Sequence, residues 1–364
     1  MITELKFKPD FPRSAERFDQ WWNHEVIDRP PVTLRVRPRR QIRPVPAPAT
    51  VREHWTRIDY VLDCAIARME ATDYVGDSFP ALCPTLGPDV TATLLGGDLL
   101  FDEHGTSTQP IIEEPRQWER ITRSQPRFHS RYWRALEELT AAAVREADNR
   151  YIVGIADLRW TFDLLAAVRD SESLRLDMLQ SPALIRRAAR QATRASIGCF
   201  ERLYSKIAES GMGMTSWIPM YHRGPAYAVR CDFWTDSPSA IVRELIIGEI
   251  ARALEPLDRA IFQVRGVGAL RHLDMLLELP QIHAIQWEYG PGNGPAMRWI
   301  DIYRRCLAAG KAVQVIATDP HDALATLDAL GAAGVWLYVD QPFGSVHHAN
   351  AFLDDVQAHC RVSV

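Results

Sequence analysis

The chain has 364 residues, a length typical of one barrel domain with added helices. Hydrophobic residues make up 47% and charged residues 24% of it, the balance of a globular protein rather than a disordered one. The formal net charge is -4, so no positive surplus is present to hold a nucleic-acid backbone. The sequence shows no signal-peptide pattern and no run of eighteen apolar residues. We therefore expect a cytoplasmic protein that binds neither membrane nor nucleic acid.

The cysteines are scattered and form no CxxC pair, which predicts free thiols rather than a disulfide framework or a zinc ribbon. They stand at Cys64, Cys83, Cys199, Cys231, Cys306 and Cys360.

In the first half of the chain, apolar segments typical of buried strands alternate with long helical patterns. The strands are expected at Val32–Val36, Tyr74–Ser78, Tyr151–Ile155 and Val229–Phe233. The long helices are expected at Val51–Thr72, His129–Asp148, Pro182–Glu209 and Ser239–Leu254. Residues Arg35–Pro48 are basic and rich in proline, which predicts a loop.

The second half repeats a strand and a helix with short connections. Its strands are expected at Ala260–Arg265, Ala284–Glu288, Lys311–Ala317 and Val335–Val339, and its helices at Leu270–Leu279, Met297–Ala308, Ala323–Leu330 and about His347–His359. Gly310 and Gly334 stand where a helix ends and a strand begins, as expected of helix C-caps. This repetition predicts a parallel sheet that is covered on both faces.

Eight strands with intervening helices predict an α/β fold of the (β/α)8 TIM-barrel type. We expect one domain over residues 1–364, with a helical extension at residues 1–30. An open, doubly wound sheet is the alternative. Against it, the sequence has neither a GxGxxG turn after a strand nor a phosphate-binding lysine loop.

In such barrels the chemistry lies where strands end and the following loops begin. Polar and aromatic side chains gather at those positions, whereas the strand interiors are aliphatic. The candidates are Arg35, Arg37, Asp77, Trp160, Asp232, Gln263, Arg265, Trp287 and Glu288, with His347 and His348 after the last strand. Each also has a purely structural explanation as a helix cap, an ion pair or a packed aromatic ring.

Several of these segments resemble the uroporphyrinogen decarboxylase superfamily, which also includes the corrinoid and coenzyme M methyltransferases. The segments are GDSFPALCPTLGP at residues 76–88, RWTFDLLAAVR at 159–169, LRVRPRR at 34–40 and FGSVHH at 343–348. The resemblance implies that Asp77 is the central acid and that Arg35 and Arg37 grip substrate carboxylates. It makes His347 or His348 a catalytic candidate. IFQVRGVGALRHLDMLLELPQIHAIQWEYGPGNGP at 261–295 resembles an uncharacterised subgroup of the superfamily.

One position sets the chain apart from the methyltransferases of the superfamily. They bind zinc through a His-x-Cys pair at the end of the fifth strand, and here that pair is Gln263 and Arg265. An amide and a guanidinium cannot replace an imidazole and a thiolate on zinc. We therefore expect neither a metal nor a cofactor, although a different metal site built from Cys83, His222 and Cys231 stays open.

The remaining side chains predict a cofactor-independent lyase that decarboxylates a small carboxylate substrate. Arg265, with Arg35 or Arg37, would hold carboxylates in bidentate pairs. Asp77 would stabilise a developing cation, and His347 or His348 would supply a proton. A methyltransferase of the corrinoid or coenzyme M type with an altered metal site is the main alternative. Two further functions remain open, a hydrolase using Asp77 with Glu288 and a non-catalytic ligand-binding barrel. A homodimer also remains open as the assembly.

Overall fold

The computed structural model describes residues 4–38 and 40–362. Its larger sheet has six parallel strands in the order β1-β11-β10-β9-β8-β7. These are β1 (Val32–Val36), β7 (Ala226–Arg230), β8 (Arg259–Arg265), β9 (Ala284–Glu288), β10 (Ala312–Ala317) and β11 (Val335–Phe343). The first strand of the chain thus pairs with the last, as expected when a sheet curls round on itself. The predicted α/β class with parallel strands is confirmed.

A smaller parallel sheet, ordered β2-β5-β6, lies between β1 and β7. Its strands are β2 (Ala81–Leu82), β5 (Ile152–Ile155) and β6 (Thr215–Ser216). A single bridge between Thr33 and Gly76 joins it to β1. On the other side, Trp217 Nε1 donates a hydrogen bond of 2.7 Å to the carbonyl of Ala228 in β7. The arrangement is TIM-barrel-like, with a curled parallel sheet whose backbone pairing is weakest at these two junctions.

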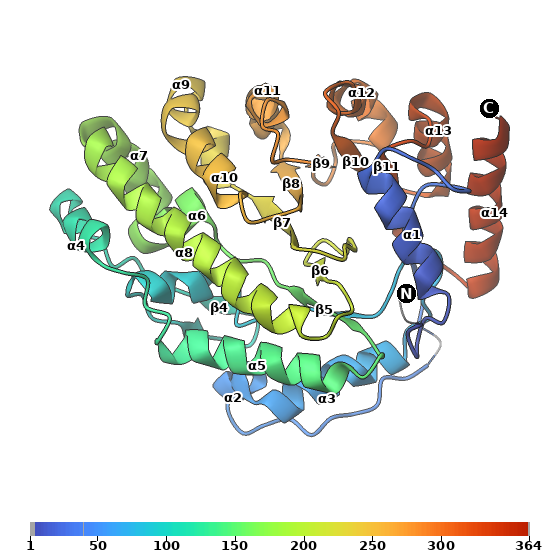
Figure 1. Cartoon of the computed structure of the whole chain (residues 1–364), viewed down its shortest axis with the longest axis horizontal. Coiled ribbons are helices and arrows are strands. Elements are labelled where there is room, and N and C mark those ends of the chain that lie inside the picture. Colours follow the sequence, from blue (N-terminus) through green and yellow to red (C-terminus); the bar gives the residue numbers. More distant parts are fainter. Residues whose placement is uncertain (1–3, 39, 363–364) are drawn as a thin grey trace.

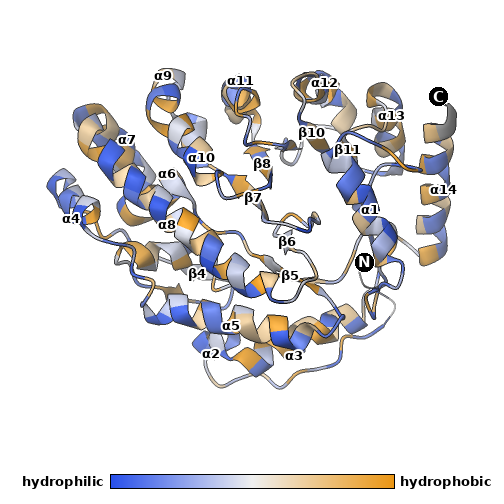
Figure 2. Ribbon diagram, in the orientation of Figure 1, coloured by the Kyte–Doolittle hydropathy of each residue, from blue (hydrophilic) through white to orange (hydrophobic). Residues whose placement is uncertain are grey.

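Helices surround the strands (Figure 1). They are α1 (Phe11–Trp22), α2 (Val51–Thr56), α3 (Ile58–Glu70), α4 (Trp118–Arg123), α5 (Arg131–Ala147), α6 (Thr161–Arg169), α7 (Ser171–Gln180), α8 (Pro182–Ala208), α9 (Ser239–Ile241), α10 (Ile247–Ala253), α11 (Leu273–Leu277), α12 (Ile300–Ala308), α13 (Pro320–Leu330) and α14 (Val346–Val362). Hydrophilic and hydrophobic residues alternate along them, as in α5 and α8 (Figure 2), because one face of each helix packs on the core. Within the described residues, no helix combines the length and the apolar character needed to cross a bilayer.

Most of the predicted elements are confirmed, and the differences have local causes. The predicted helix 51–72 is two helices, because the backbone at Arg57 is extended (φ -80°, ψ 106°). The predicted strand 74–78 forms only the bridge at Gly76, which has a φ of +65°, and strand pairing follows at β2. The fourth strand begins three residues earlier than predicted, at Ala226. The short strand β6 and the hairpin of β3 (Leu100–Phe101) and β4 (Thr106–Ser107) were not predicted.

Alternation along the strands separates two cores. In β11, Leu337 and Val339 belong to the large core that the strands share with the surrounding helices. Trp336, between Val335 and Leu337, belongs instead to a second core inside the curled sheet. This period of two is the ordinary geometry of a strand, whose successive side chains point to opposite faces. It decides which residue types face the interior.

Helix α1 fills the amino-terminal end of that interior. Phe18 and Trp21 pack edge-on against Trp336, with ring centroids 5.1 and 5.3 Å apart. Trp21 Nε1 also donates to the carbonyl of Gly334, directly before β11, over 3.1 Å. Trp22 Nε1 donates to the carbonyl of Tyr221 over 3.0 Å. Because this end of the sheet is filled by aromatic rings, a ligand is expected to enter at the opposite, carboxyl ends of the strands.

A buried ion cluster holds α1 and the start of β1 together. The Asp77 carboxylate is fully buried, 2.9 Å from Nη1 of Arg17 on α1 and 2.5 Å from Nη1 of Arg29. It also accepts the backbone N–H of Val32, at the start of β1, over 2.8 Å. Burial opposes ionisation, but the charges of Arg29 and Arg17 outweigh it and hold the pKa of Asp77 below its ordinary value. Asp28 forms a second, bidentate pair with Arg17.

Replacing Asp77 with Asn should destabilise the protein strongly, because two guanidinium groups then lose their buried partner. We expect the free energy of unfolding to fall by about 3 kcal/mol, measured by denaturant unfolding. Asp301→Asn is the matched control, since Asp301 is 87% exposed and only 3.5 Å from an exposed arginine. A fall that is equally small in both variants would contradict the structural role of Asp77.

The same cluster predicts acid sensitivity. The folded-state pKa values of Asp77 and Asp28 lie below their ordinary values; for Asp28, burial opposes this shift and the paired Arg17 outweighs it. Such carboxylates contribute stability above the unfolded-state pKa of about 4, and that stability is lost as the pH falls through the folded-state pKa. The free energy of unfolding, measured between about pH 7 and about pH 2, should therefore decrease more steeply with falling pH for the wild type than for Asp77→Asn. Parallel curves would argue against the cluster as a source of the acid dependence.

Candidate functional site

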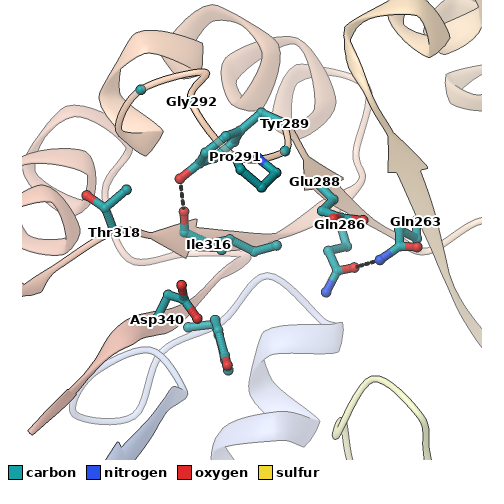
Figure 3. A pocket seen from close by; sticks show the side chains of 12 residues that line it. Gln263, Gln286, Glu288, Tyr289, Pro291, Gly292, Ile316, Thr318 and Asp340 are labelled. Carbon is teal, nitrogen blue, oxygen red and sulfur yellow. Dashed lines mark hydrogen bonds between the residues drawn. The ribbon is translucent and has the colours of Figure 1, made fainter. Parts of the chain in front are cut away.

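A cavity of about 520 Å³ opens at the carboxyl ends of β8, β9, β10 and β11 (Figure 3). Each strand contributes the side chains that its alternation turns inward, and the loop after β9 covers one side. The lining residues are Gln263, Gln286, Glu288, Tyr289, Gly290, Pro291, Gly292, Gly294, Ile316, Thr318, Tyr338 and Asp340. The position agrees with the general rule that barrels carry their chemistry at this end.

Three glutamines form a ladder across neighbouring strands. Gln263, Gln286 and Gln314 stand opposite one another in β8, β9 and β10. Gln263 Nε2 donates to Gln286 Oε1 over 2.5 Å, and Gln286 Nε2 donates to Gln314 Oε1. Gln263 Oε1 is buried and has no hydrogen-bond partner among the described residues. At this end of the ladder the amide oxygen is thus enclosed by protein and unpaired.

Above the ladder, charged side chains of alternating sign follow the strand ends. Arg265 Nε lies 3.1 Å from the Glu288 carboxylate, and its Nη1 lies 3.7 Å from Asp232. Asp232 is also 3.7 Å from Arg230, which pairs with Asp157 over 2.7 Å. Arg265 is 53% exposed, so water screens much of its charge. Every acid in this row therefore has an arginine next to it, at the rim rather than deep in the cavity.

The opposite side of the cavity carries Asp340 and two tyrosines. Arg35 Nη2 donates to the Asp340 carboxylate over 2.9 Å and to its backbone carbonyl over 2.7 Å. The Tyr289 hydroxyl donates to the carbonyl of Ile316 over 2.7 Å. Burial, followed by the charge of nearby carboxylates, raises the pKa of Tyr289 to about 12. Tyr289 is therefore a neutral hydrogen-bond donor at physiological pH.

The loop that follows β9 is held in place from the next helix. Gly290 and Gly292 have φ angles of +80° and +77°, a backbone region that favours glycine. Asp322, in the first turn of α13, accepts the backbone N–H groups of Ala296 and Met297 over 2.8 and 3.1 Å. This loop is thus positioned by hydrogen bonds.

A second buried aspartate positions the loop after β7. The Asp163 carboxylate accepts the backbone N–H groups of Asp232 and Phe233 over 2.9 and 2.8 Å. Burial raises the pKa of Asp163 to about 6, and these hydrogen bonds act against that rise. Asp163 thereby holds the start of the loop that carries Asp232.

The structure places four of the sequence-predicted site residues together. Gln263 and Glu288 line the cavity, and Arg265 and Asp232 form the ion pairs at its rim. Arg265 therefore faces the mouth, but its guanidinium already contacts carboxylates. Arg35 and Arg37 line an adjoining cavity of about 640 Å³ between β1 and residues 72–79. Tyr338 lines both cavities and so lies between them.

The other predicted residues lie elsewhere. Asp77 lies beside the start of β1, at the end that α1 fills, so the structure does not bring it to the cavity. His347 and His348 are exposed in the first turn of α14 and do not line the cavity. Trp160 is buried and stacks on Tyr227 at a centroid distance of 5.0 Å.

Trp287 is also buried, and it points away from the cavity. It packs edge-on against Trp299 with ring centroids 5.3 Å apart. Gln286 and Glu288, on either side of it in β9, face inward, so strand alternation turns Trp287 towards the helices.

Within residues 4–38 and 40–362, no three His, Cys, Asp or Glu side chains converge as metal ligands. Cys83 lines a separate cavity of about 360 Å³ near α3, and Cys231 is buried in the large core. Arg39, in the basic loop, lies outside the described residues.

The sequence contained an unused signal for the residues that were missed. In AIQWE, Gln286 and Glu288 are two apart and must share a face, and in VWLYVD, Tyr338 and Asp340 do the same. Alternation along the strands identifies Gln286 and Tyr338 as inward-facing residues. Selection by position at the strand end alone identifies Trp287 together with Glu288. Tyr289 follows the strand directly, and no pattern in the sequence marks it out.

Of the comparisons with known proteins, the one with solved structures bears on the fold. No protein-family model and no curated protein matches this sequence. Among solved structures, the chain is similar to a methyltransferase from Methanosarcina mazei, with a TM-score of 0.61 and 10% sequence identity. The match covers 95% of this chain and 98% of that chain. Over the matched 95% of its length the chain therefore shares the fold of that protein, with about one residue in ten identical.

The glutamine ladder predicts a specific loss of stability. Gln286→Leu leaves Gln263 Nε2 and Gln314 Oε1 without partners inside the curled sheet, which should lower the free energy of unfolding by about 2–4 kcal/mol. Denaturant unfolding measures the change. Gln180→Leu, at an exposed position on α7, is the control and should leave the stability nearly unchanged. Equal stability of the two variants would mean that the ladder contributes nothing.

Proposed function

We propose that this chain is an enzyme that transfers a methyl group between small molecules, with the cavity at the carboxyl ends of β8–β11 as its substrate site. The observation that carries the proposal is the placement of the Glu288 carboxylate beside Gln263 and two tyrosines in this cavity. The full-length similarity in fold to a methyltransferase supports methyl transfer as the reaction. We further propose that residues 1–364 form one domain and that its two sheets act as a single (β/α)8 barrel.

The residues present do not fit zinc. The zinc pair of the related methyltransferases would fall on Gln263 and Arg265. The side-chain nitrogen of Gln263 is already bonded to Gln286, and Arg265 is paired with Glu288. A guanidinium cannot coordinate a cation, so the proposed reaction has no step on a metal at these two residues.

Glu288 is the group that suits proton removal. In the proposed reaction the lone pair of the acceptor atom forms a bond to the methyl carbon. The bond between that carbon and the donor breaks, and its electron pair leaves with the donor. The proton released by the acceptor passes to Glu288, which is 32% exposed and held by Arg265. The cavity walls supply the rest of the catalysis by holding the two reactants in line.

A decarboxylase is the second candidate, and one observation favours it. Arg37 lines the adjoining cavity, is exposed and forms no ion pair within the described residues, so it is free to hold a carboxylate there. In the main cavity the charged lining residues are two carboxylates, Glu288 and Asp340, which would repel such a substrate. The methyltransferase reading therefore fits the main cavity better.

The test is methyl transfer from an isotope-labelled methyl donor to a panel of small thiols, alcohols and amines, followed by NMR. Glu288→Gln keeps the size of the side chain and removes the base, so turnover should fall by at least about a hundredfold. Glu278→Gln, at an exposed position paired with Arg243, should keep full turnover. Release of carbon dioxide from a carboxylate panel without any methyl transfer would favour the decarboxylase instead. Full turnover by Glu288→Gln would remove Glu288 from the reaction.

A further inference from the structure

We infer that the substrate site extends into the adjoining cavity, where it holds the apolar, aromatic part of a neutral ligand, and that the Tyr338 hydroxyl donates a hydrogen bond to an oxygen of that ligand. The inference names a substrate class for the proposed site and in that sense rests on the proposed function. Its evidence concerns binding alone.

Tyr338 stands between the two cavities. In the sheet it is paired in register with Ile316 of β10 on one side and with Thr33 of β1 on the other. Ile316 lines the main cavity, Thr33 lines the adjoining one, and Tyr338 lines both. Two positions earlier, Trp336 lies in the core inside the curled sheet, so strand alternation turns Tyr338 inward as well. The two cavities are therefore neighbouring compartments on the same face of the sheet.

The Tyr338 hydroxyl is available to a ligand. Within residues 4–38 and 40–362 it has no hydrogen-bond partner, whereas the Tyr289 hydroxyl is bonded to a backbone carbonyl. It is not among the enclosed side-chain atoms that lack a partner, so it reaches accessible surface. Burial of the side chain raises the pKa of Tyr338, so the hydroxyl stays protonated at physiological pH. It therefore offers a hydrogen-bond donor where the two cavities meet.

The rest of the partition between the cavities is an exposed ion pair. Arg35 lines the adjoining cavity and Asp340 the main one, and Arg35 Nη2 lies 2.9 Å from the Asp340 carboxylate. The two side chains are 56% and 62% exposed, and exposed pairs contribute little to stability. Because separating them costs little, a ligand can occupy both compartments.

The lining of the adjoining cavity favours an apolar group. The hydroxyls of Thr33, Thr72 and Ser78 each take part in a hydrogen bond within the protein. Asp73 lies 3.5 Å from Arg40. The volume of about 640 Å³ holds an aromatic ring, and burying a ring against an apolar lining is favourable. The apolar lining residues are Leu34, Val36, Pro38, Phe79, Pro219 and Pro342.

Direct binding tests the inference without any turnover. Titration of the full chain, followed by NMR, would compare acetophenone, acetone and benzoate. Acetophenone should bind at least about tenfold more tightly than acetone, because its ring buries additional apolar surface. Equal binding of acetone would overturn the inference. Tighter binding of benzoate than of acetophenone would also overturn it, since the cavity would then belong to an anion held by Arg37.

A conservative variant tests the hydroxyl. Tyr338→Phe should weaken acetophenone about fivefold and leave the affinity for ethylbenzene, which has the ring but no acceptor, near the wild-type value. Tyr204→Phe, on α8 and outside both cavities, is the matched control and should bind both probes like the wild type. Unchanged acetophenone affinity in Tyr338→Phe would overturn the inference.

The position of the ring is measured by NOEs in protein with labelled methyl groups. The ring protons of acetophenone should give NOEs to the methyl groups of Leu34 and Val36, which line the adjoining cavity. Ring NOEs to Ile316 alone would place the ring in the main cavity and contradict the inference.

Binding and reaction can fail separately. Acetophenone binding that depends on Tyr338, together with no methyl transfer to any acceptor, would keep the aromatic site and end the methyltransferase proposal. Methyl transfer between small molecules with no preference for an aromatic ring would keep the proposed function and end this inference.

Discussion

The buried carboxylate of Asp77 is the contact on which the rest of the arrangement depends. It joins Arg17 of α1, Arg29 and the backbone of Val32 within hydrogen-bonding distance. An ionised carboxylate without water is stable only when its charge and its lone pairs are matched, and here both are. The consequence is that α1 is held across the amino-terminal end of the curled sheet, where its aromatic residues fill the interior. One end of the structure is thereby closed, and the carboxyl ends of the strands are left for chemistry.

Strand alternation then decides what the open end contains. Every second residue of β8, β9, β10 and β11 faces inward, and towards the carboxyl ends most of these residues are polar. Ala284 is followed two residues later by Gln286 and then by Glu288, and Trp336 by Tyr338 and Asp340. Because the strands are in register, like residues meet across the sheet, and the glutamine ladder is the result. A polar layer inside a sheet is tolerable only when its groups are bonded, and the two hydrogen bonds of the ladder meet part of that requirement.

The positive and negative charges at the rim of the cavity compensate one another. Acids and arginines alternate from Asp157 through Arg230, Asp232 and Arg265 to Glu288. Pairs of this kind contribute little to stability when they are exposed. They do fix the orientation of Glu288, the acid that also lines the cavity. Positioning of this kind matters for a proton acceptor, because proton transfer depends first on geometry.

The sequence by itself determined the α/β class, the parallel strands and most of their boundaries, because strand and helix periods are local properties of the chain. It also identified Gln263 and Glu288, since both stand near the end of an apolar strand. Only the tertiary structure decided that Asp77 lies at the closed end, because its partners Arg17 and Arg29 are 60 and 48 residues away in the sequence. The same holds for Trp287, whose direction depends on which face of β9 is inside. The cavity is made of side chains from four strands and one loop, and their convergence is a property of the curled sheet that no single segment contains.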